Sequence, residues 1–279
     1  MLKYYIVDAF TEYPFGGNTA GVVLLDKSGF PNEDLMLQVA AELRYSETVF
    51  VGCMEGGGWH LRYFTPRAEV SLCGHATIAA FALLHAEGMA EGTCRVSTMA
   101  GELQVVAAKQ VMMQMATPSI VRALSSDEVV EAYSALGLES AALLPPEIAT
   151  TGLPDIMVQV PNVEVLNRLH PDMDKVAALT TRLGAVSIHA FAFGHDGHTA
   201  HVRDFAPAFG VPEESATGTA NAALTHYLAS HGVIGHGEYR FLQGEAMGRP
   251  SVVCARRASD GTVHVGGPAA VVAEGWLRV

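Results

Sequence analysis

The spacing of apolar residues predicts a chain of many short strands and a few helices. Apolar residues alternate or cluster as in strands at 4–10, 20–25, 46–51, 61–66, 95–106, 110–116, 148–160 and 186–193. Helical spacing begins after Asn32, again at about 76–84, after Ser125, and after Asp172. Ser125 and Glu128 have capping-box spacing for the third helix. The pattern is typical of a mixed α/β protein.

The second half of this pattern repeats the first. Both halves contain an apolar helix that follows a glycine turn, and these helices end near Gly88 and Gly232. The matching segments are 31–50 with 171–190, 62–66 (RYFTP) with 203–207 (RDFAP), and 73–76 (CGHA) with 217–220 (TGTA). Three matches in the same order predict two similar α/β halves that face each other, each with a helix N-terminus directed into the cleft between them. We expect the first half to comprise residues 1–118 and the second half residues 119–267. A C-terminal strand at about 268–279 can join the first half.

The repeat preserves the fold pattern and changes the chemistry. Thr217 stands where Cys73 stands, and Ser187 stands where Glu47 stands. A racemase that uses two matched thiols would need a cysteine in both turns. Strand periodicity places Glu47 on the face of Val49 and Val51, where burial would raise the pKa of its carboxyl group. A structural acid with satisfied hydrogen bonds is the alternative for Glu47.

Composition and charge restrict the classes of partner. Of the 279 residues, 49% are hydrophobic and 16% are charged, and the net charge is −12. This balance argues against nucleic acid or an anionic membrane as a general partner. The four cysteines are Cys53, Cys73, Cys94 and Cys254, and no two of them have CxxC spacing. We therefore expect reduced thiols in a soluble, cytoplasmic protein. The longest apolar run, 76–86, is too short to span a bilayer.

Several other side chains have competing interpretations. His195, His198 and His201 recur at every third residue, but strands do not place such residues on one face, and we predict no metal site. The Gly16-Gly17 pair lacks the context of a nucleotide-binding fingerprint. Asn18 is either a turn residue or a substrate ligand. For Arg62 and Arg203, a structural ion pair is at least as good an explanation as a substrate contact. We expect Asp204 and Glu69 to be structural or supporting residues.

Five groups of residues together resemble a known family. They are 8–18 (DAFT and PFGGN), 46–50 (SETVF), 62–77 (RYFTP and EVSLCGHAT), 203–220 (RDFAP and EESATGTA) and 243–251 (QG and GRPS). The combination resembles the PhzF-like phenazine biosynthesis family. The resemblance implies a diaminopimelate epimerase-like fold, in which each half is a barrel-like mixed sheet around a central helix. It also implies a homodimer without cofactor or metal, and an activity that isomerises dihydro-3-hydroxyanthranilate.

The resemblance also implies roles for individual residues. Glu47 would be the general acid/base that moves a proton, His75 would contact Glu47 or the substrate, and Glu214 would be the second acidic residue. The family usually has Asp and Ser where this chain has Glu214 and Thr219. The remaining candidates are substrate-binding residues: Asn18, Ser46, Cys73, Gly74, Thr217, Gly218 and Thr219.

The sequence therefore predicts a cofactor-independent isomerase that moves a proton between carbons of a small carboxylate-bearing substrate. Glu47 would carry the proton, and the helix N-termini at Gly74 and Gly218 would stabilise developing negative charge. Two alternatives stay open. One is an epimerase or racemase of an amino-acid-like substrate. The other is a small-molecule-binding or partner-binding protein without activity, motivated by the changes at Glu214 and Thr219.

Overall fold

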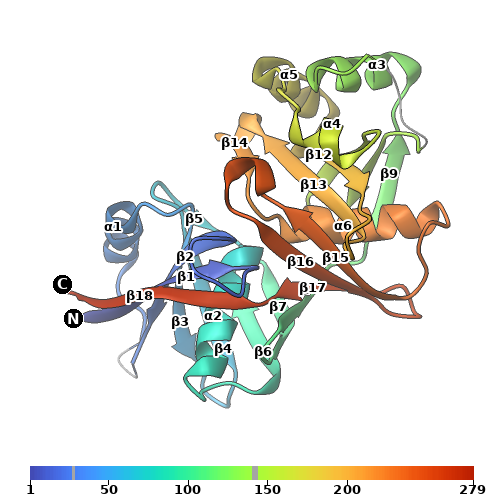
Figure 1. Cartoon of the computed structure of the whole chain (residues 1–279). Helices are drawn as coiled ribbons and strands as arrows, with labels where there is room; N and C mark the ends of the chain where they lie inside the picture. Colours follow the sequence, from blue (N-terminus) through green and yellow to red (C-terminus); the bar gives the residue numbers. More distant parts are fainter. Residues whose placement is uncertain (27–28, 140–143) are drawn as a thin grey trace. The chain divides into compact units, whose positions relative to one another are not determined.

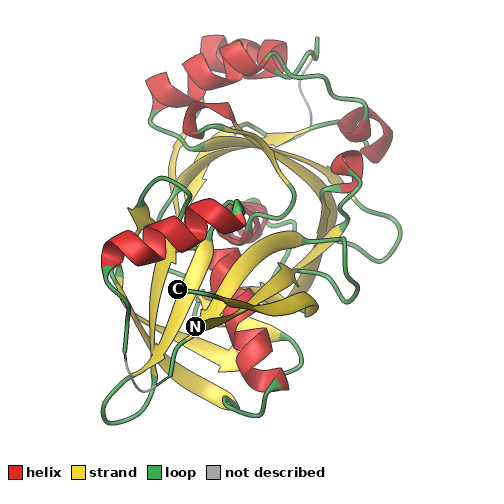
Figure 2. Cartoon of the chain, turned by 90° about the vertical axis from the view of Figure 1, so that its left-hand side faces the viewer, coloured by secondary structure: helices red, strands yellow, loops and turns green. Residues whose placement is uncertain are grey.

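The computed structural model describes residues 1–26, 29–139 and 144–279, and it divides into two compact units. Unit 1 comprises residues 1–114 and 266–279, and unit 2 comprises residues 115–265. Figures 1 and 2 show that each unit combines a curved sheet with a few helices. No helix in these three described ranges is both long enough and apolar enough to cross a membrane.

Unit 1 is a mixed sheet around one long helix. Its strands lie in the order β18-β1-β2-β3-β4-β6-β7-β8, with β2/β3 and β4/β6 parallel and the other neighbours antiparallel, and the short β5 adds to β4. The elements are β1 (Leu2–Ala9), β2 (Asn18–Leu24), α1 (Glu33–Leu43), β3 (Thr48–Cys53), β4 (Trp59–Phe64), β5 (Glu69–Val70), α2 (Gly74–Ala86), β6 (Gly92–Thr98), β7 (Gly101–Ala107), β8 (Val111–Gln114) and β18 (Ala269–Leu277).

Unit 2 has the same order of strands and the same pattern of parallel pairs. Its strands run β9-β10-β11-β12-β13-β15-β16, with β11/β12 and β13/β15 parallel, and β14 adds to β13. The elements are β9 (Ser119–Ala123), α3 (Ser126–Ala135), β10 (Glu147–Thr150), β11 (Pro154–Gln159), α4 (Val163–Asn167), α5 (Met173–Leu183), β12 (Ser187–Phe193), β13 (Ala200–Ala206), η1 (Pro207–Phe209), β14 (Val211–Glu214), α6 (Gly218–Ser230), β15 (Gly237–Gln243), η2 (Glu245–Met247) and β16 (Ser251–Arg257). Strand β17 (Val263–Gly267) contains the boundary between the units.

The registers of β3/β4 and β12/β13 agree with the internal repeat. Thr48 pairs with Phe64 in unit 1, and Ile188 pairs with Phe205 in unit 2. The residues that precede them, Glu47 and Ser187, therefore occupy equivalent positions.

Arg62 and Arg203 also occupy equivalent positions and both make structural ion pairs. Arg62 binds both carboxylate oxygens of Glu69 at 2.7 and 2.6 Å. Arg203 binds both oxygens of Glu213 at 2.8 Å and also donates to the Leu169 carbonyl. The structure thus supports the ion-pair interpretation of both arginines. Each guanidinium also stacks over the phenylalanine two residues later.

Each unit encloses an apolar helix. Helix α2 contacts strands β1, β2, β3, β7, β8 and β18, and helix α6 contacts β9, β10, β11 and β16. Both helices are buried on nearly all sides, as expected for helices that are apolar all round. The remaining helices cover the outer face of each sheet, where α1 packs on Phe50 and Phe64, and α3, α4 and α5 pack on Ile188 and Phe205.

Helix starts follow the local sequence as predicted. The Asn32 side chain accepts from the Leu35 N–H at 2.8 Å, and Ser125 forms the predicted capping box with Glu128. The single strand predicted over 95–106 is wrong. A turn divides it into β6 and β7, because Gly101 adopts a φ of +114°, and the Thr98 hydroxyl accepts from the Ala100 N–H.

Candidate active site

The starts of α2 and α6 have the same backbone design. Cys73 and Thr217 are the N-cap residues, both extended, and neither side chain caps the first turn of its helix. The residue four positions later bonds back to the N-cap carbonyl in both cases, through Thr77 Oγ1 at 2.7 Å and Asn221 Nδ2 at 2.9 Å. The first-turn N–H groups therefore have no side-chain cap, and the helix dipole favours an anionic group there.

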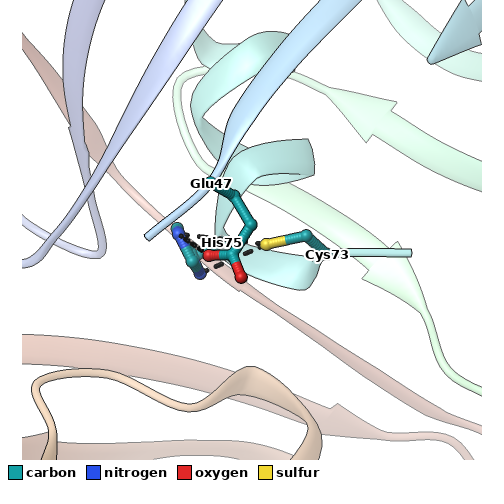
Figure 3. Close-up of side chains that lie close together, drawn as sticks. All are labelled: Glu47, Cys73 and His75. Atoms are coloured by element: carbon teal, nitrogen blue, oxygen red, sulfur yellow. Dashed lines mark hydrogen bonds and ion pairs between the residues drawn. The ribbon is translucent and has the colours of Figure 1, made fainter. Parts of the chain in front are cut away.

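In unit 1, four candidate side chains meet at this helix start, and Figure 3 shows three of them: Glu47, Cys73 and His75. His75 Nε2 lies 3.3 Å from Glu47 Oε2 and 3.4 Å from Ser46 Oγ. His75 Nδ1 lies 3.4 Å from Cys73 Sγ. The loop before β3 supplies Ser46 and Glu47, and the first turn of α2 supplies Cys73 and His75. The structure therefore brings together residues 26 positions apart in the sequence.

His75 is held in its neutral form at neutral pH. Burial lowers the pKa of its imidazole, and the Glu47 carboxylate opposes that shift only in part. A neutral ring with its proton on Nε2 directs that N–H toward Glu47 and Ser46. Nδ1 is then the acceptor for the Cys73 thiol, so Cys73 acts as a hydrogen-bond donor in this arrangement.

The position of Glu47 differs from the sequence prediction. Strand β3 begins at Thr48, so Glu47 lies just before it, and its side chain is 20% exposed. The predicted enclosure of this carboxylate on an apolar strand face is wrong, because strand alternation does not extend to residue 47. The Glu47 carboxylate instead contacts the imidazole of His75. A partly exposed carboxylate beside a neutral imidazole can take up and release protons, which a fully enclosed one could not do readily.

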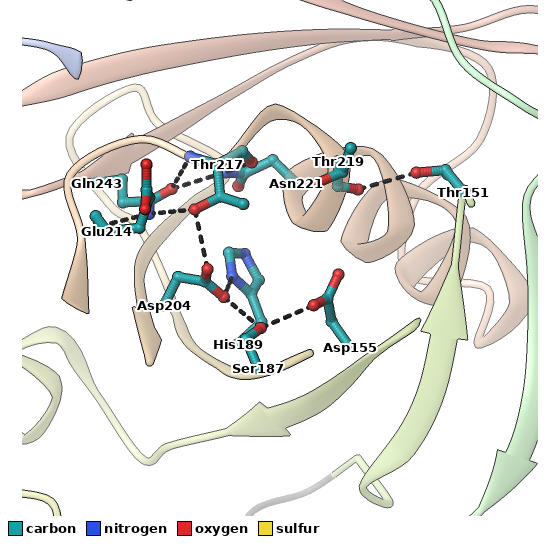
Figure 4. A network of polar contacts seen from close by, with 10 residues as sticks. All are labelled: Thr151, Asp155, Ser187, His189, Asp204, Glu214, Thr217, Thr219, Asn221 and Gln243. Carbon is teal, nitrogen blue, oxygen red and sulfur yellow. Dashed lines mark hydrogen bonds and ion pairs between the residues drawn. The ribbon is translucent and has the colours of Figure 1, made fainter. Parts of the chain in front are cut away.

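In unit 2, the equivalent position is the centre of a buried polar network (Figure 4). Ser187 Oγ lies 2.8 Å from Asp155 Oδ1 and 2.6 Å from Asp204 Oδ1. His189 Nδ1 lies 2.9 Å from the same Asp204 oxygen, and Thr217 Oγ1 donates to the other Asp204 oxygen at 3.0 Å. All except Thr217 are fully or almost fully buried. The network thus links three strands to the N-cap of α6.

Burial raises the pKa of Asp155 well above its ordinary value, and the neighbouring Asp204 carboxylate adds to the shift. Asp204 accepts hydrogen bonds from Ser187, His189 and Thr217. We therefore place the proton on Asp155, which donates to Ser187, while Ser187 donates to Asp204.

Gln243 fixes the α6 start from the opposite side. Its side-chain oxygen accepts from the Thr217 N–H at 3.1 Å and from Asn221 Nδ2 at 2.9 Å. Its side-chain nitrogen donates to the Glu214 carbonyl at 2.9 Å and lies 3.1 Å from Thr217 Oγ1. One buried amide thus positions the segment 214–221, which contains most of the candidates of unit 2.

The other predicted residues have the following places. Asn18 is buried at the start of β2, opposite Ala9 of β1. Glu214 ends β14 opposite Asp204, and its side chain is half-buried. Gly74 and Gly218 are the first residues of α2 and α6, and the Thr219 carbonyl accepts from Thr151 Oγ1 at 3.1 Å. Apart from Asn18, the candidates therefore gather at the N-terminus of the enclosed helix of their unit.

Sequence reasoning missed Asp155 and His189 and gave Asp204 a supporting role only. Asp155 lies at the start of β11, and it reaches Ser187 because β11 and β12 pair in parallel with these two residues in register. His189 faces Asp204 directly across the β12/β13 pair. The sequence contained one signal that could have identified Asp155 and His189. Each is an ionisable side chain at an inward position of an otherwise apolar strand.

Two groups of side chains in the described part of the chain have metal-binding donors within 4.8 Å of one another. One is Glu47, Cys73 and His75, and the other is Asp196, His198 and His201. The argument that strand periodicity keeps His198 and His201 apart is wrong. His198 lies in the loop before β13, so alternation along the strand does not fix its direction.

Comparisons with known proteins agree on one family. The sequence profile of the PhzC-PhzF family, described as phenazine biosynthesis-like protein, matches residues 7–275. An uncharacterised isomerase of Deinococcus radiodurans is 36% identical, with 99% of this chain and 94% of that protein aligned. The trans-2,3-dihydro-3-hydroxyanthranilate isomerase of Pseudomonas fluorescens is 33% identical over 92% of this chain and 90% of its own length.

Solved structures support the predicted fold class. A PhzF-family protein of Bacillus anthracis superposes with a TM-score of 0.88 at 27% identity, covering 100% of this chain and 99% of that one. A hydroxyproline epimerase of Agrobacterium vitis superposes with a TM-score of 0.62 at 12% identity, covering 98% and 91%. The second match shows a common fold only. Together they confirm the epimerase-like α/β fold.

Proposed function

Because the chain belongs to the family of phenazine biosynthesis-like proteins, whose curated relatives are named isomerases, we propose that it is a cofactor-independent isomerase. Its reaction moves a proton between two carbons of a small carboxylate-bearing substrate. The observation that supports this best is the pairing of one partly exposed carboxylate, Glu47, with the neutral imidazole of His75 at an uncapped helix start. Unit 2 has a serine at the position equivalent to Glu47, so the proposed chemistry needs a single base.

The proposed steps follow from this geometry. Glu47 removes a proton from a carbon next to an unsaturated system, and the electrons delocalise toward the substrate's acidic group. First-turn N–H groups of α2 stabilise the negative charge that develops. His75, which is neutral, donates its Nε2–H toward Glu47 in the resting state and orients the carboxylate. Glu47 then returns the proton to a different carbon, and no external acid is consumed.

We assign substrate-binding roles to the remaining candidates on the strength of the family resemblance. In unit 1 these are Asn18, Ser46, Cys73 and Gly74. In unit 2 they are Thr217, Gly218 and Thr219, whereas Glu214 is the second acidic residue of the proposed catalytic set. Glu214 is one methylene group larger than the aspartate that the family usually has, and Thr219 is one methyl group larger than the usual serine. Both changes reduce the space available to a substrate. The substrate therefore need not be the phenazine precursor itself.

A solvent-exchange assay tests this proposal directly. The enzyme is incubated in D₂O with trans-2,3-dihydro-3-hydroxyanthranilate and, in parallel, with other small unsaturated carboxylates and trans-4-hydroxyproline. We expect an isomerised product with partial deuterium incorporation at one carbon, because a single base both removes and returns the proton. Inversion of a stereocentre without isomerisation would support the epimerase instead. Saturable binding without exchange would support the inactive binding protein.

Replacing Cys73 by serine separates the isomerase from a two-thiol epimerase. Cys73 contacts His75 as a hydrogen-bond donor, and a serine hydroxyl can donate in the same place. We expect kcat/KM to fall by no more than about tenfold, since the thiol carries no proton to or from carbon in the proposed steps. A loss on the order of 10³-fold, with unchanged thermal stability, would assign proton transfer to the thiol.

A further inference from the structure

The hairpin between β12 and β13 carries a cluster that the isomerase chemistry does not use. Asp196 Oδ1 lies 3.0 Å from His198 Nδ1 and 3.3 Å from His201 Nε2. The same carboxylate oxygen also accepts from the His198 backbone N–H at 3.3 Å. Asp196 Oδ1 therefore contacts two imidazole nitrogens. The cluster lies at a turn in which Gly197 adopts a φ of +94°.

Donor spacing in this cluster fits a bound metal ion. In a tetrahedral or octahedral site with bonds of about 2.0–2.2 Å, neighbouring ligand atoms lie about 3.0–3.4 Å apart. The two separations from Asp196 Oδ1 are 3.0 and 3.3 Å, and all three donor atoms lie within 4.8 Å of one another. Two of the three donor separations therefore match those that a shared ion requires, and the third lies within 4.8 Å.

The state of His198 supports the same conclusion. Its Nδ1 atom is inaccessible to solvent and forms no aligned hydrogen bond with any described residue, although Asp196 Oδ1 is only 3.0 Å away. A buried imidazole nitrogen without a hydrogen bond is unfavourable unless another partner satisfies it. A cation between this nitrogen and the carboxylate would satisfy both groups.

Glu245 supplies the supporting contact that metal-binding histidines commonly have. Its Oε2 lies 2.6 Å from His201 Nδ1, on the other side of the ring from Asp196. A carboxylate that accepts from Nδ1 fixes the tautomer in which Nε2 is the free donor to a metal. Without an ion, both ring nitrogens of His201 face carboxylates, and the ring is 7% exposed.

We propose that Asp196, His198 and His201 bind a divalent first-row transition metal ion, with Glu245 orienting His201. Two imidazoles and one carboxylate suit Zn²⁺ and its neighbours in the series, whereas Mg²⁺ and Ca²⁺ prefer oxygen ligands alone. Three protein ligands leave at least one coordination position for water. Through Glu245, the site would link the β12–β13 hairpin to η2, which begins two residues after Gln243. The Gln243 side chain in turn contacts the α6 start.

The test is titration of the chelator-treated, desalted full chain with ZnCl₂, followed by calorimetry. We expect one ion bound per chain and a rise in the unfolding temperature with Zn²⁺ but not with Mg²⁺. His198→Ala should weaken binding by at least about 100-fold, and Glu245→Gln by about 10- to 100-fold. His195→Ala is the matched control, because His195 is an exposed imidazole on the same hairpin, and it should leave the affinity unchanged.

Cobalt substitution distinguishes this site from the cysteine cluster. Co²⁺ bound by Asp196, His198 and His201 should show no thiolate charge-transfer band, whereas Co²⁺ at Cys73 should show one. The absence of stoichiometric zinc binding would overturn the proposal. So would affinity that His198→Ala leaves unchanged, or a cobalt spectrum dominated by the thiolate band. His198 lies in a loop, so its alanine variant keeps the test valid even where His201→Ala fails to fold.

Discussion

Replacing Glu47 by glutamine is expected to lower kcat on any true substrate by about 10³-fold or more, which is the scale of a lost general base. Glutamine has nearly the same shape and can still contact His75, but it cannot accept a proton from carbon. Glu47 Oε2 lies 3.3 Å from His75 Nε2, so the substitution removes the carboxylate that carries the proton in the proposed steps. Initial rates and deuterium exchange from D₂O measure the loss.

The control for this variant is Glu42→Gln, which removes an exposed carboxylate from α1. It should leave the rate unchanged, because it lies on the surface of a helix that packs on the outer face of the sheet. Ligand binding by Glu47→Gln should persist, since the helix start and its N–H groups are untouched. Turnover of Glu47→Gln within tenfold of the unmodified enzyme would rule out Glu47 as the proton carrier.

Replacing Asp204 by alanine is expected to destabilise the protein by about 3–5 kcal/mol, the range for breaking a buried charged network. Asp204 accepts from Ser187, His189 and Thr217, all of which lose their partner inside the sheet. Buried donors without acceptors account for most of this loss. Urea unfolding followed by fluorescence and circular dichroism measures it, and Glu238→Ala, at an exposed position of β15, should change the free energy by less than about 0.5 kcal/mol.

Asp155→Asn should behave in the opposite way and depend on pH. The folded-state pKa of Asp155 is raised above its ordinary value of 3.8, so the stability that the protonated acid contributes is complete below that value and is lost as pH rises through the folded pKa. Asparagine imitates the protonated form and escapes this loss. The variant should therefore gain stability relative to the unmodified protein as pH increases from about 4 toward 8. A difference that is constant over this range would show that the proton is not on Asp155.

The local features of the fold were predictable from short stretches of sequence. Asn32 and Ser125 cap helices because their side chains reach the N–H three residues later, and that distance is fixed by helix geometry. The turn at 99–100 escaped prediction because the residues on both sides of it have strand patterns, and the positive φ of Gly101 alone marks the reversal. The prediction that Glu47 lies on the apolar face of the strand is wrong for a related reason. Periodicity shows which residues share a face of a strand, but it does not show at which residue the strand begins.

The sequence by itself determined the internal repeat, the two glycine turns at the helix starts, and the difference between Glu47 and Ser187. Each of these is a comparison of residue types at matched spacings, which needs no knowledge of packing. Only the tertiary structure decided that Asp155 and Asp204 both reach Ser187, and that Glu245 supports His201. Periodicity gives the face of a strand, whereas the partner across the sheet depends on strand order and register, and these are set by long-range packing of the whole unit.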